Sequence, residues 1–260
     1  MAVTIDFGGR VAIVTGGARG VGRGITRRFL EAGADVVVCG RSAPEEPVRA
    51  SGREAFFVAA DVRDIEQIDR VVTATTERFG RLDVLVNNAG GAPYADAATV
   101  SPRFTEKILA LNLNAPIHFA QRANAVMQKQ DEGGSILQIT SVSGIRPSPG
   151  TAAYGAAKAG LVSLTQTLAV EWAPKVRVNA IAAGMIRTEQ ADLHYGDEEG
   201  IRRVSATVPL GRLGNPEDVG DACLFLASPL ASYVSGAVLL LHGGGERPAF
   251  LEAATTNEKS

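Results

Sequence analysis

The 260-residue sequence contains only two cysteines, Cys39 and Cys223, which lie far apart in the chain and among apolar neighbours. Such cysteines are typical of buried free thiols, so we expect neither a disulfide nor a thiolate metal site. The three histidines, His118, His194 and His242, do not have the spacing of metal ligands either. The sequence therefore predicts no bound metal ion.

The chain also lacks long apolar runs and clusters of basic residues. No apolar stretch reaches the roughly 18 residues that a membrane-spanning helix requires, and Asp6 and Arg10 interrupt the region where a secretory signal would be apolar. Lysine and arginine number 26 against 28 aspartate and glutamate residues, a formal net charge of -2. This balance argues against nucleic acid or a membrane as a partner, and we expect a cytoplasmic protein.

What the chain does have is 45% hydrophobic residues, arranged as short β-branched runs that alternate with stretches of helical character. Most of these runs are almost continuously apolar, which is typical of strands buried on both faces of a parallel sheet. We therefore predict a single-domain, Rossmann-like α/β fold: a doubly wound parallel sheet of about seven strands with helices on both faces. The expected strands are "RVAIVTG", "ADVVVCG", "AFFVAAD", "LDVLVNNAG", "SILQITS", "VRVNAIAAG" and "AVLLLHGG". The domain is expected to cover residues 1–245, with residues 246–260 as a mobile tail.

The first strand ends in a glycine-rich turn, "TGGARGVGRG", which leads directly into a helix expected from Gly20 to Ala32. Glycines allow a tight turn and the close approach of a pyrophosphate, whose charge is then held by free N–H groups at the helix N-terminus. The spacing is T-G-x-x-x-G-x-G and differs from the G-x-G-x-x-G of other dinucleotide-binding folds. An ordinary strand-to-helix turn is the alternative. The expected cofactor contacts in this turn are Gly16, Arg19, Gly20, Val21 and Gly22.

The end of the second strand bears on the choice between NADP(H) and NAD(H). A free ribose 2'-hydroxyl would be met there by Asp or Glu, whereas this chain has Gly40 followed by Arg41. Arg41, together with Arg19 in the glycine turn, can form charge-assisted hydrogen bonds with a 2'-phosphate. NADP(H) is therefore favoured over NAD(H), the alternative being that both arginines are solvated surface charges.

Two further strand ends supply candidate cofactor contacts. Asp61 follows the third strand and would either accept a hydrogen bond from the adenine edge or cap the helix that begins near Asp64. "NNAG", residues 87–90, ends the fourth strand at the edge of the sheet that should face the ligand. The contacts expected in these two segments are Asp61, Val62, Asn88, Ala89 and Gly90.

A tyrosine and a lysine lie four residues apart in "TAAYGAAKAG", residues 151–160. One helical turn separates such positions, so Lys158 can hold its ammonium near the Tyr154 hydroxyl. A free tyrosine has a pKa of about 10, some three units too high for efficient acid–base chemistry near neutrality. A cation at ~4 Å in an effective dielectric near 20 contributes about 4 kcal/mol, which is enough to lower the Tyr154 pKa by that amount when an oxidised nicotinamide assists. The pair therefore predicts an acid–base tyrosine tuned by a lysine.

Together these motifs resemble those of the short-chain dehydrogenase/reductase family, in the group that includes 3-oxoacyl-[acyl-carrier-protein] reductases and hydroxysteroid dehydrogenases. The resemblance extends from "TGGARGVG" through "NNAG", Asn112, "TSVSG", the Tyr154 and Lys158 pair and "NAIAAGMIRTE" to "GRLGNPEDVGDACLFLASPLASYVSG". It implies an NADP(H)-dependent oxidoreductase that transfers a hydride between the nicotinamide and a carbonyl or secondary alcohol carbon of a small molecule.

The resemblance assigns two more catalytic positions. Ser141, thirteen residues before Tyr154, matches the serine that hydrogen-bonds the substrate oxygen, and Ser143 is its nearby competitor. Asn112 matches the residue that holds a water in a proton relay from the lysine, with Asn114 as the competitor. The implied catalytic set is Asn112, Ser141, Tyr154 and Lys158, of which Tyr154 and Lys158 also contact the cofactor.

The chain departs from the family pattern at two places. Ala183 stands before Gly184 where the family usually has proline, and alanine leaves this loop freer than a proline with φ fixed near about -65°. The nicotinamide carboxamide is expected to contact this loop through Gly184, Ile186 and Thr188. His242 stands where the family commonly has aspartate, in a last strand that lies near a subunit interface. We expect a homo-oligomer, a tetramer or a dimer.

Between residues 187 and 211 the family places its substrate lid. Here that segment is rich in charges and has no long apolar stripe. Arg202 and Arg203 would meet an anionic carrier such as a phosphopantetheine thioester, or would form a solvated helix face. A 3-oxoacyl thioester and a steroid-like ketone are both open as substrates. The alternative function is a catalytically silent NADP(H)-binding sensor or scaffold, against which the complete catalytic set argues.

Overall fold

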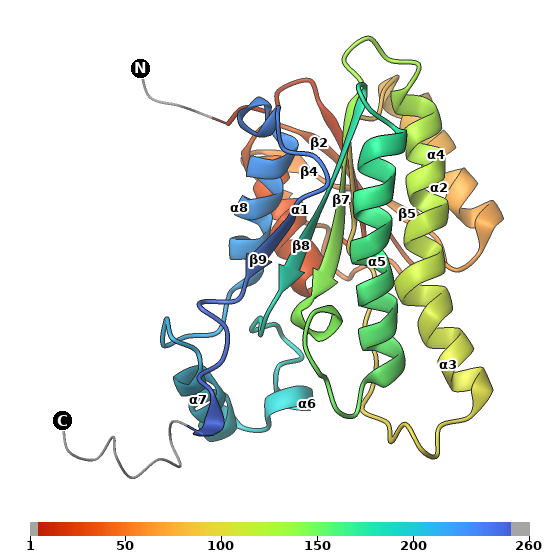
Figure 1. Cartoon of the computed structure of the whole chain (residues 1–260). Coiled ribbons are helices and arrows are strands. Elements are labelled where there is room, and N and C mark those ends of the chain that lie inside the picture. Colours follow the sequence, from red (N-terminus) through yellow and green to blue (C-terminus); the bar gives the residue numbers. More distant parts are fainter. Residues whose placement is uncertain (1–4, 251–260) are drawn as a thin grey trace.

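The computed structural model describes residues 5–250 and shows the predicted seven-stranded parallel sheet (Figure 1). The order of the strands is β5-β2-β1-β6-β7-β8-β9. Because the order reverses between β1 and β6, the chain winds outward from the centre in both directions, as the prediction of a doubly wound sheet requires. The strands are β1 (Val11–Thr15), β2 (Asp35–Gly40), β5 (Phe56–Ala59), β6 (Val84–Asn87), β7 (Gly134–Ser141), β8 (Val176–Ala183) and β9 (Val238–Leu241).

Helices cover both faces of the sheet (Figure 1). One face packs against α2 (Ile65–Phe79), α4 (Ala115–Met127) and α5 (Ala152–Glu171), and the other against α1 (Gly20–Glu31) and α8 (Pro216–Ala227). Successive residues of β1 enter the two cores in alternation, which is why the strand is apolar along its whole length. The predicted fold class is therefore confirmed, with one hydrophobic core on each side of a single sheet.

Several local features position the chain around this sheet. The side chain of Asp64 accepts hydrogen bonds from two backbone N–H groups at the start of α2, and α3 (Pro102–Leu109) has proline in its first turn. Between α3 and α4 the helix widens into a π-turn at Ala110–Asn114. A small antiparallel pair, β3 (Arg49–Ala50) and β4 (Arg53–Glu54), lies outside the main sheet and was not expected from the sequence.

The segment expected to form the lid contains two short helices, α6 (Asp192–Tyr195) and α7 (Glu198–Thr207). Ala191, Ile201, Val208 and Leu213 form a small apolar cluster of their own beneath these helices. The segment is therefore a compact unit that follows the carboxyl end of β8, and we keep the name lid for residues 187–211. Within residues 5–250, no helix is both long and apolar enough to cross a membrane.

The expected tail, residues 246–260, is bonded to the lid and to a neighbouring loop at its start. The backbone N–H of Arg247 donates to the Thr207 carbonyl at 3.1 Å, and Glu246 forms an ion pair with Arg146. Residues 251–260 lie outside the described part of the chain, as do the side chains of Leu193 and His194.

Candidate active site

The carboxyl ends of four central strands bring the predicted site residues to one edge of the sheet. Thr15 ends β1, Asn87 ends β6, Ser141 ends β7 and Ala183 ends β8. In a doubly wound fold this edge, at the point where the strand order reverses, is where a ligand binds. The motifs that are scattered through the sequence therefore meet in a single region.

The glycine turn after β1 is tightly packed against its own helix. A Cβ at Gly22 would lie 2.3 Å from the Gly16 carbonyl oxygen, so only glycine fits there. The N-cap residue Arg19 makes no side-chain hydrogen bond to α1, and the first turn of α1 contains no acidic residue. The chain thus leaves a positively polarised helix start without a cap from its own helix, as an anion-binding turn requires.

Thr15 fastens this turn to the "NNAG" segment, a role that was not assigned from the sequence. Its hydroxyl oxygen accepts hydrogen bonds from the backbone N–H groups of Asn88 and Ala89, both at 2.9 Å. The Asn88 side chain returns a hydrogen bond to the Thr15 carbonyl at 2.8 Å. The sequence indicated a role for Thr15 only through its position as the first residue of the T-G-x-x-x-G-x-G motif.

Arg19 and Arg41, the residues predicted to meet a 2'-phosphate, are both exposed. Across residues 5–250 neither guanidinium takes part in an ion pair or a side-chain hydrogen bond, unlike most arginines of the chain. Both are therefore available to an anionic ligand.

Asp61 is held by a neighbouring arginine. Its carboxylate accepts from the Arg63 guanidinium at 2.9 Å and 2.5 Å, and these hydrogen bonds lower the pKa of Asp61 to about 2. The suggestion that Asp61 caps the following helix is wrong, because Asp64 does so. Val62, beside it, is buried.

Lys158 is buried beneath the site, with 3% of its surface exposed. Its ammonium donates to the Ile139 carbonyl at 2.9 Å and lies 5.5 Å from the centre of the Tyr154 ring. Burial disfavours the charged form and lowers the pKa of Lys158 to about 8. The i, i+4 spacing on α5 therefore places the two side chains together as predicted.

The pKa of Tyr154 is raised by its protein surroundings, and the lowering expected from the sequence, which requires an oxidised nicotinamide as well as Lys158, stays a prediction. Burial of the phenol disfavours the phenolate and raises the pKa of Tyr154, and a hydrogen bond with Ser141 offsets this only in part. Lys158 does not reverse the effect, because its ammonium is directed to the Ile139 carbonyl. Electrostatic interaction with Tyr195 of the lid also raises the pKa of Tyr154. The sequence did not indicate that these two residues are neighbours.

The structure distinguishes the two candidate serines. Ser141 is the serine close enough to Tyr154 to lower its pKa, and its oxygen accepts a hydrogen bond from the Ser143 backbone N–H at 3.1 Å. The Ser143 hydroxyl instead accepts from Ser148 at 3.0 Å, within the following loop. Ser141, and not Ser143, is therefore the serine next to Tyr154.

The two candidate asparagines differ in the same way. Asn112 is fully buried in the π-turn, and its amide donates to the carbonyls of Gly91 and Ile108 and accepts from the Gly91 N–H. Asn114 is exposed. A Cβ at Gly90 would lie 2.7 Å from the Asn112 side-chain oxygen and 3.3 Å from the Lys158 nitrogen. Asn112 thus holds Gly91, the residue after "NNAG", and Gly90 lies close to both Asn112 and Lys158.

The segment after β8 reaches back toward the glycine turn. Gly184 donates to the Leu241 carbonyl at 2.8 Å, and Ile186 pairs with Gly214 in an isolated bridge. The Thr188 methyl group would be 3.8 Å from a Cβ at Gly20. The loop is held at its base despite the alanine at 183, and Thr188 lies next to the helix start expected to bind the cofactor.

The charged residues of the lid mostly pair with one another. Arg202 and Arg203 both contact Glu199, at 2.7 Å and 2.9 Å, and are largely exposed, which agrees with a solvated helix face. Glu189 was not singled out from the sequence. Its carboxylate accepts a hydrogen bond from the Gly20 backbone N–H at 2.8 Å.

Comparison with known proteins identifies the family. The family model described as Enoyl-(Acyl carrier protein) reductase matches residues 16–246. The chain belongs to the short-chain dehydrogenase/reductase family. As a member, it is an oxidoreductase that acts on alcohol or carbonyl groups with a nicotinamide cofactor.

Its relatives act on different substrates. A 3-oxoacyl-[acyl-carrier-protein] reductase of Thermotoga maritima is 36% identical, over 91% of this chain and 97% of the relative. A 3alpha-hydroxysteroid dehydrogenase of Mediterraneibacter gnavus is 37% identical, over 90% of this chain and 96% of the relative. The solved structure of an aldohexose dehydrogenase from Thermoplasma acidophilum superposes with a TM-score of 0.86 at 29% identity, covering 93% of this short-chain dehydrogenase/reductase and 96% of the other chain.

Proposed function

We propose that this short-chain dehydrogenase/reductase interconverts a ketone and a secondary alcohol with NADP(H), using Ser141, Tyr154 and Lys158 as its catalytic residues and Asn112 in support. The observation that carries the proposal is the buried Lys158, whose ammonium lies 5.5 Å from the centre of the Tyr154 ring, with Ser141 close enough to Tyr154 to influence its pKa, at the ligand-binding edge of the sheet. A sheet edge built only for packing would not bury a cation beside a tyrosine.

The residues at this edge fit a dinucleotide. The uncapped start of α1 and the close-packed glycine turn would hold the diphosphate through Gly16, Gly20, Val21 and Gly22. The other residues proposed to line the cofactor are Asp61, Val62, Asn88, Ala89, Gly90, Tyr154, Lys158, Gly184, Ile186 and Thr188. When bound, the nicotinamide supplies or accepts the hydride.

Arg19 and Arg41 support NADP(H) as the preferred cofactor. Both guanidiniums are exposed beside the turn, and among the described residues neither is neutralised by an ion pair. Charge-assisted hydrogen bonds to a 2'-phosphate contribute about 1.5–3 kcal/mol each, enough to set the preference.

In the direction of reduction, Tyr154 gives its phenolic proton to the carbonyl oxygen as negative charge develops there. Ser141 donates a hydrogen bond to the same oxygen and holds it within reach of Tyr154. Burial raises the pKa of Tyr154 and so favours the neutral phenol, which is the form needed for this step. Lys158 stabilises the phenolate that remains, and Asn112 holds Gly91, the residue after "NNAG".

The substrate class that the cavities favour is a ketone with an apolar body. A cavity of about 290 Å³ adjoins Tyr154. Its lining is largely apolar and comes from the loop after β6, from α3 and from the start of α5, including Pro93, Phe104 and Ile108. A steroid-like ketone or a 3-oxoacyl chain suits such a lining better than a sugar does. The Arg202 and Arg203 side chains, paired with Glu199, give no support to a carrier-bound phosphate.

Replacement of Tyr154 tests the proposal. NADPH oxidation is measured with 3-oxoacyl thioesters, steroid ketones, quinones and sugars for the wild type and for Tyr154→Phe. We expect turnover of an apolar ketone, and a loss of about 10²–10⁴-fold in kcat/KM in the variant because the proton donor is gone. Calorimetry should show NADPH binding close to that of the wild type.

The control separates catalysis from a sensor or scaffold role. Tyr94→Phe removes the hydroxyl of a largely exposed tyrosine that lies outside the catalytic set, and it should leave turnover unchanged. Full activity of Tyr154→Phe would contradict the assignment of the proton donor. Tight NADPH binding without turnover of any compound would instead favour the sensor.

A further inference from the structure

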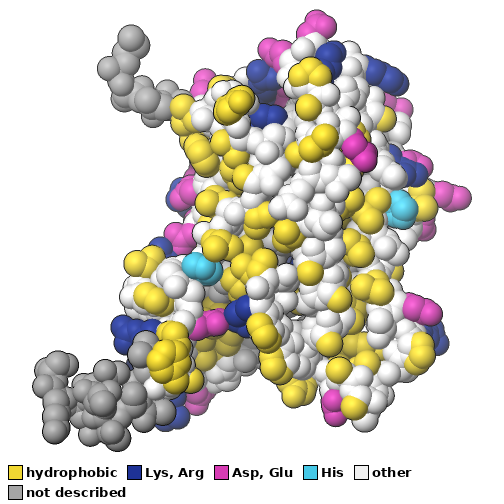
Figure 2. Space-filling model, in the orientation of Figure 1, with side chains coloured by type: hydrophobic (Ala, Val, Ile, Leu, Met, Phe, Trp, Pro, Cys, Tyr) yellow, Lys and Arg dark blue, Asp and Glu magenta, His cyan; other side chains and the backbone are white. Residues whose placement is uncertain are grey.

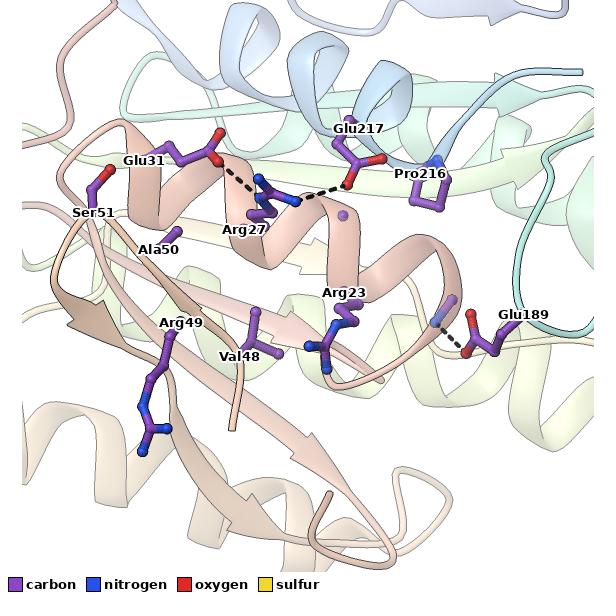
Figure 3. A pocket seen from close by; sticks show the side chains of 12 residues that line it. Arg23, Arg27, Glu31, Val48, Arg49, Ala50, Ser51, Glu189, Pro216 and Glu217 are labelled. Carbon is purple, nitrogen blue, oxygen red and sulfur yellow. Dashed lines mark hydrogen bonds and ion pairs between the residues drawn. The ribbon is translucent and has the colours of Figure 1, made fainter. Parts of the chain in front are cut away.

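The lid places a carboxylate on the helix start that we assign to the cofactor diphosphate. Glu189 lies one residue beyond Thr188, in the segment between β8 and α6, and its side chain points at the first turn of α1 (Figure 3). The Gly20 backbone N–H donates to the Glu189 carboxylate at 2.8 Å. The two residues are 169 positions apart in sequence, so this contact is a product of the fold.

This carboxylate acts where α1 has no acidic residue of its own. Arg19 provides no side-chain cap, and the first turn contains no Asp or Glu. Negative charge at a helix N-terminus is stabilised by the helix dipole and the free N–H groups. The Glu189 carboxylate therefore neutralises the positive end of α1 and accepts from the Gly20 N–H, one of the donors that would bind a diphosphate.

We propose that Glu189 is an internal competitor of the cofactor: it occupies the anion seat at Gly20 in the free enzyme and must be displaced when the diphosphate of NADP(H) binds. The inference rests on the proposed cofactor site. An amide N–H cannot make a full hydrogen bond to both anions, and two negative groups at one helix start repel each other. Glu189 thus lowers the affinity for dinucleotides.

A cavity beside Glu189 can accommodate the displaced carboxylate. Gly20, Arg23 and Glu189 line one cavity of about 310 Å³ between α1, the β3–β4 segment and the start of α8 (Figure 3). In residues 5–250 the Arg23 guanidinium makes no ion pair, whereas Arg27, one turn further along, already contacts Glu31 at 2.9 Å. Among the described residues Arg23 is therefore the cation of this cavity without an ion pair, and we take it as the partner of the displaced Glu189.

Only a short piece of the lid has to move. Arg187 and Gly214 are joined by a backbone hydrogen bond of 2.8 Å, and Gly214 donates to the Met185 carbonyl at 2.9 Å. These bonds hold the segment immediately before Thr188. Rotation of the Glu189 side chain toward Arg23 frees the Gly20 N–H without opening the base of the lid.

The test compares Glu189→Gln with wild-type enzyme by calorimetry, using NADP⁺ and adenosine 2'-monophosphate, which lacks the diphosphate. Glutamine keeps an oxygen acceptor for the Gly20 N–H and removes only the charge. We expect Glu189→Gln to bind NADP⁺ about tenfold more tightly, with unchanged affinity for adenosine 2'-monophosphate. Glu217→Gln is the matched control, because Glu217 lines the same cavity but contacts Arg27 at 3.9 Å.

Thermal unfolding supplies a second readout, in which the larger gain on adding NADP⁺ is the part that a merely structural role would not produce. Without ligand, Glu189→Gln should melt about 2 °C lower than wild type, because α1 loses its compensating charge. With saturating NADP⁺ the variant should gain more in Tm than the wild type does.

The outcomes separate this inference from the proposed function. If the wild type binds NADP⁺ and Glu189→Gln binds it with equal or lower affinity, the competitor role alone is overturned. An equal gain for adenosine 2'-monophosphate would also overturn it, because the effect would not then concern the diphosphate. Failure of wild type and variant alike to bind NADP⁺ or NAD⁺ would overturn the proposed cofactor site and this inference with it.

Discussion

Lys158 is a cation inside the protein, stabilised by a backbone carbonyl and not by a carboxylate. The Ile139 carbonyl accepts its hydrogen bond, and burial lowers its pKa to about 8 from an ordinary value of 10.5. A buried charge without an opposite charge lowers the stability of the fold. This cost agrees with the proposed role of Lys158, in which a positive charge beside Tyr154 serves catalysis.

Lys158→Met should therefore stabilise the ligand-free protein near neutral pH. The pKa of Lys158 is about 8 in the folded protein and about 10.5 in the unfolded chain. Between these pH values Lys158 is protonated in the unfolded chain and largely neutral in the folded protein. The wild type therefore gains stability as the pH rises through this range. The advantage of the variant should be about 3 kcal/mol below pH 8, and it should shrink toward pH 10.5. Urea unfolding of both proteins at pH 7 and pH 9.5 measures it. An advantage that is independent of pH would contradict a lysine that titrates near 8.

Arg41→Asp should change the cofactor preference. The variant loses a cation that is free to meet the 2'-phosphate and gains a carboxylate that can accept hydrogen bonds from a ribose hydroxyl. We expect kcat/KM for NADPH to fall about 10–100-fold while that for NADH is maintained or rises. Arg49→Asp is the control, because Arg49 is already paired with Glu54 at 2.6 Å. An unchanged ratio of NADPH to NADH use would refute the role of Arg41.

At the scale of elements, the seven strands and α1 follow from local pattern. The strands are apolar runs bounded by glycine or polar residues, and α1 begins at Gly20 as predicted. The small pair β3–β4 and the π-turn at Ala110–Asn114 carry no such pattern. Pairs of two residues contain too few side chains for a periodicity, and the π-turn is stabilised by contacts of Asn112 with Gly91, which is distant in sequence.

The sequence predicted which residue types form the candidate site, but not how their side chains are oriented and hydrogen-bonded. Ser141, Tyr154 and Lys158 occur in recognisable spacings, and the structure places them together. The upward shift that burial gives the Tyr154 pKa and the orientation of Lys158 toward Ile139 were not predicted, because both depend on packing. Glu189 was missed, because its partner is 169 residues away and no motif links them.

Across the whole molecule, the face formed by α5 and β9 carries apolar side chains while charged ones lie mainly toward the rim of the view (Figure 2). Leu239 and Leu240 of β9 and Val170 of α5 are exposed, and Tyr233, before β9, is fully exposed. Within the described sheet β9 pairs only with β8, so its other edge presents free backbone groups. These features support the proposal that this face is an interface in a homo-oligomer.

Leu240→Glu should therefore weaken assembly. Burial of a carboxylate at an apolar contact costs several kcal/mol, so we expect the variant to sediment as a smaller species than the wild type. Analytical ultracentrifugation over a range of concentrations measures the change. Ile65→Glu, at an exposed apolar position at the start of α2, is the control and should assemble normally. A wild type that sediments as a monomer would contradict the proposed oligomer.

The order of the residues alone specifies the parallel sheet, the glycine turn and the pairing of Tyr154 with Lys158 on one helix face, because each depends on spacings of a few residues or on continuous apolar runs. Tertiary structure decides which of two serines and two asparagines enters the site, how Thr15 fastens two strand ends, and that Glu189 lies on the start of α1. Those outcomes depend on hydrogen bonds between residues far apart in the chain, and such bonds form only after the sheet has brought its strand ends together.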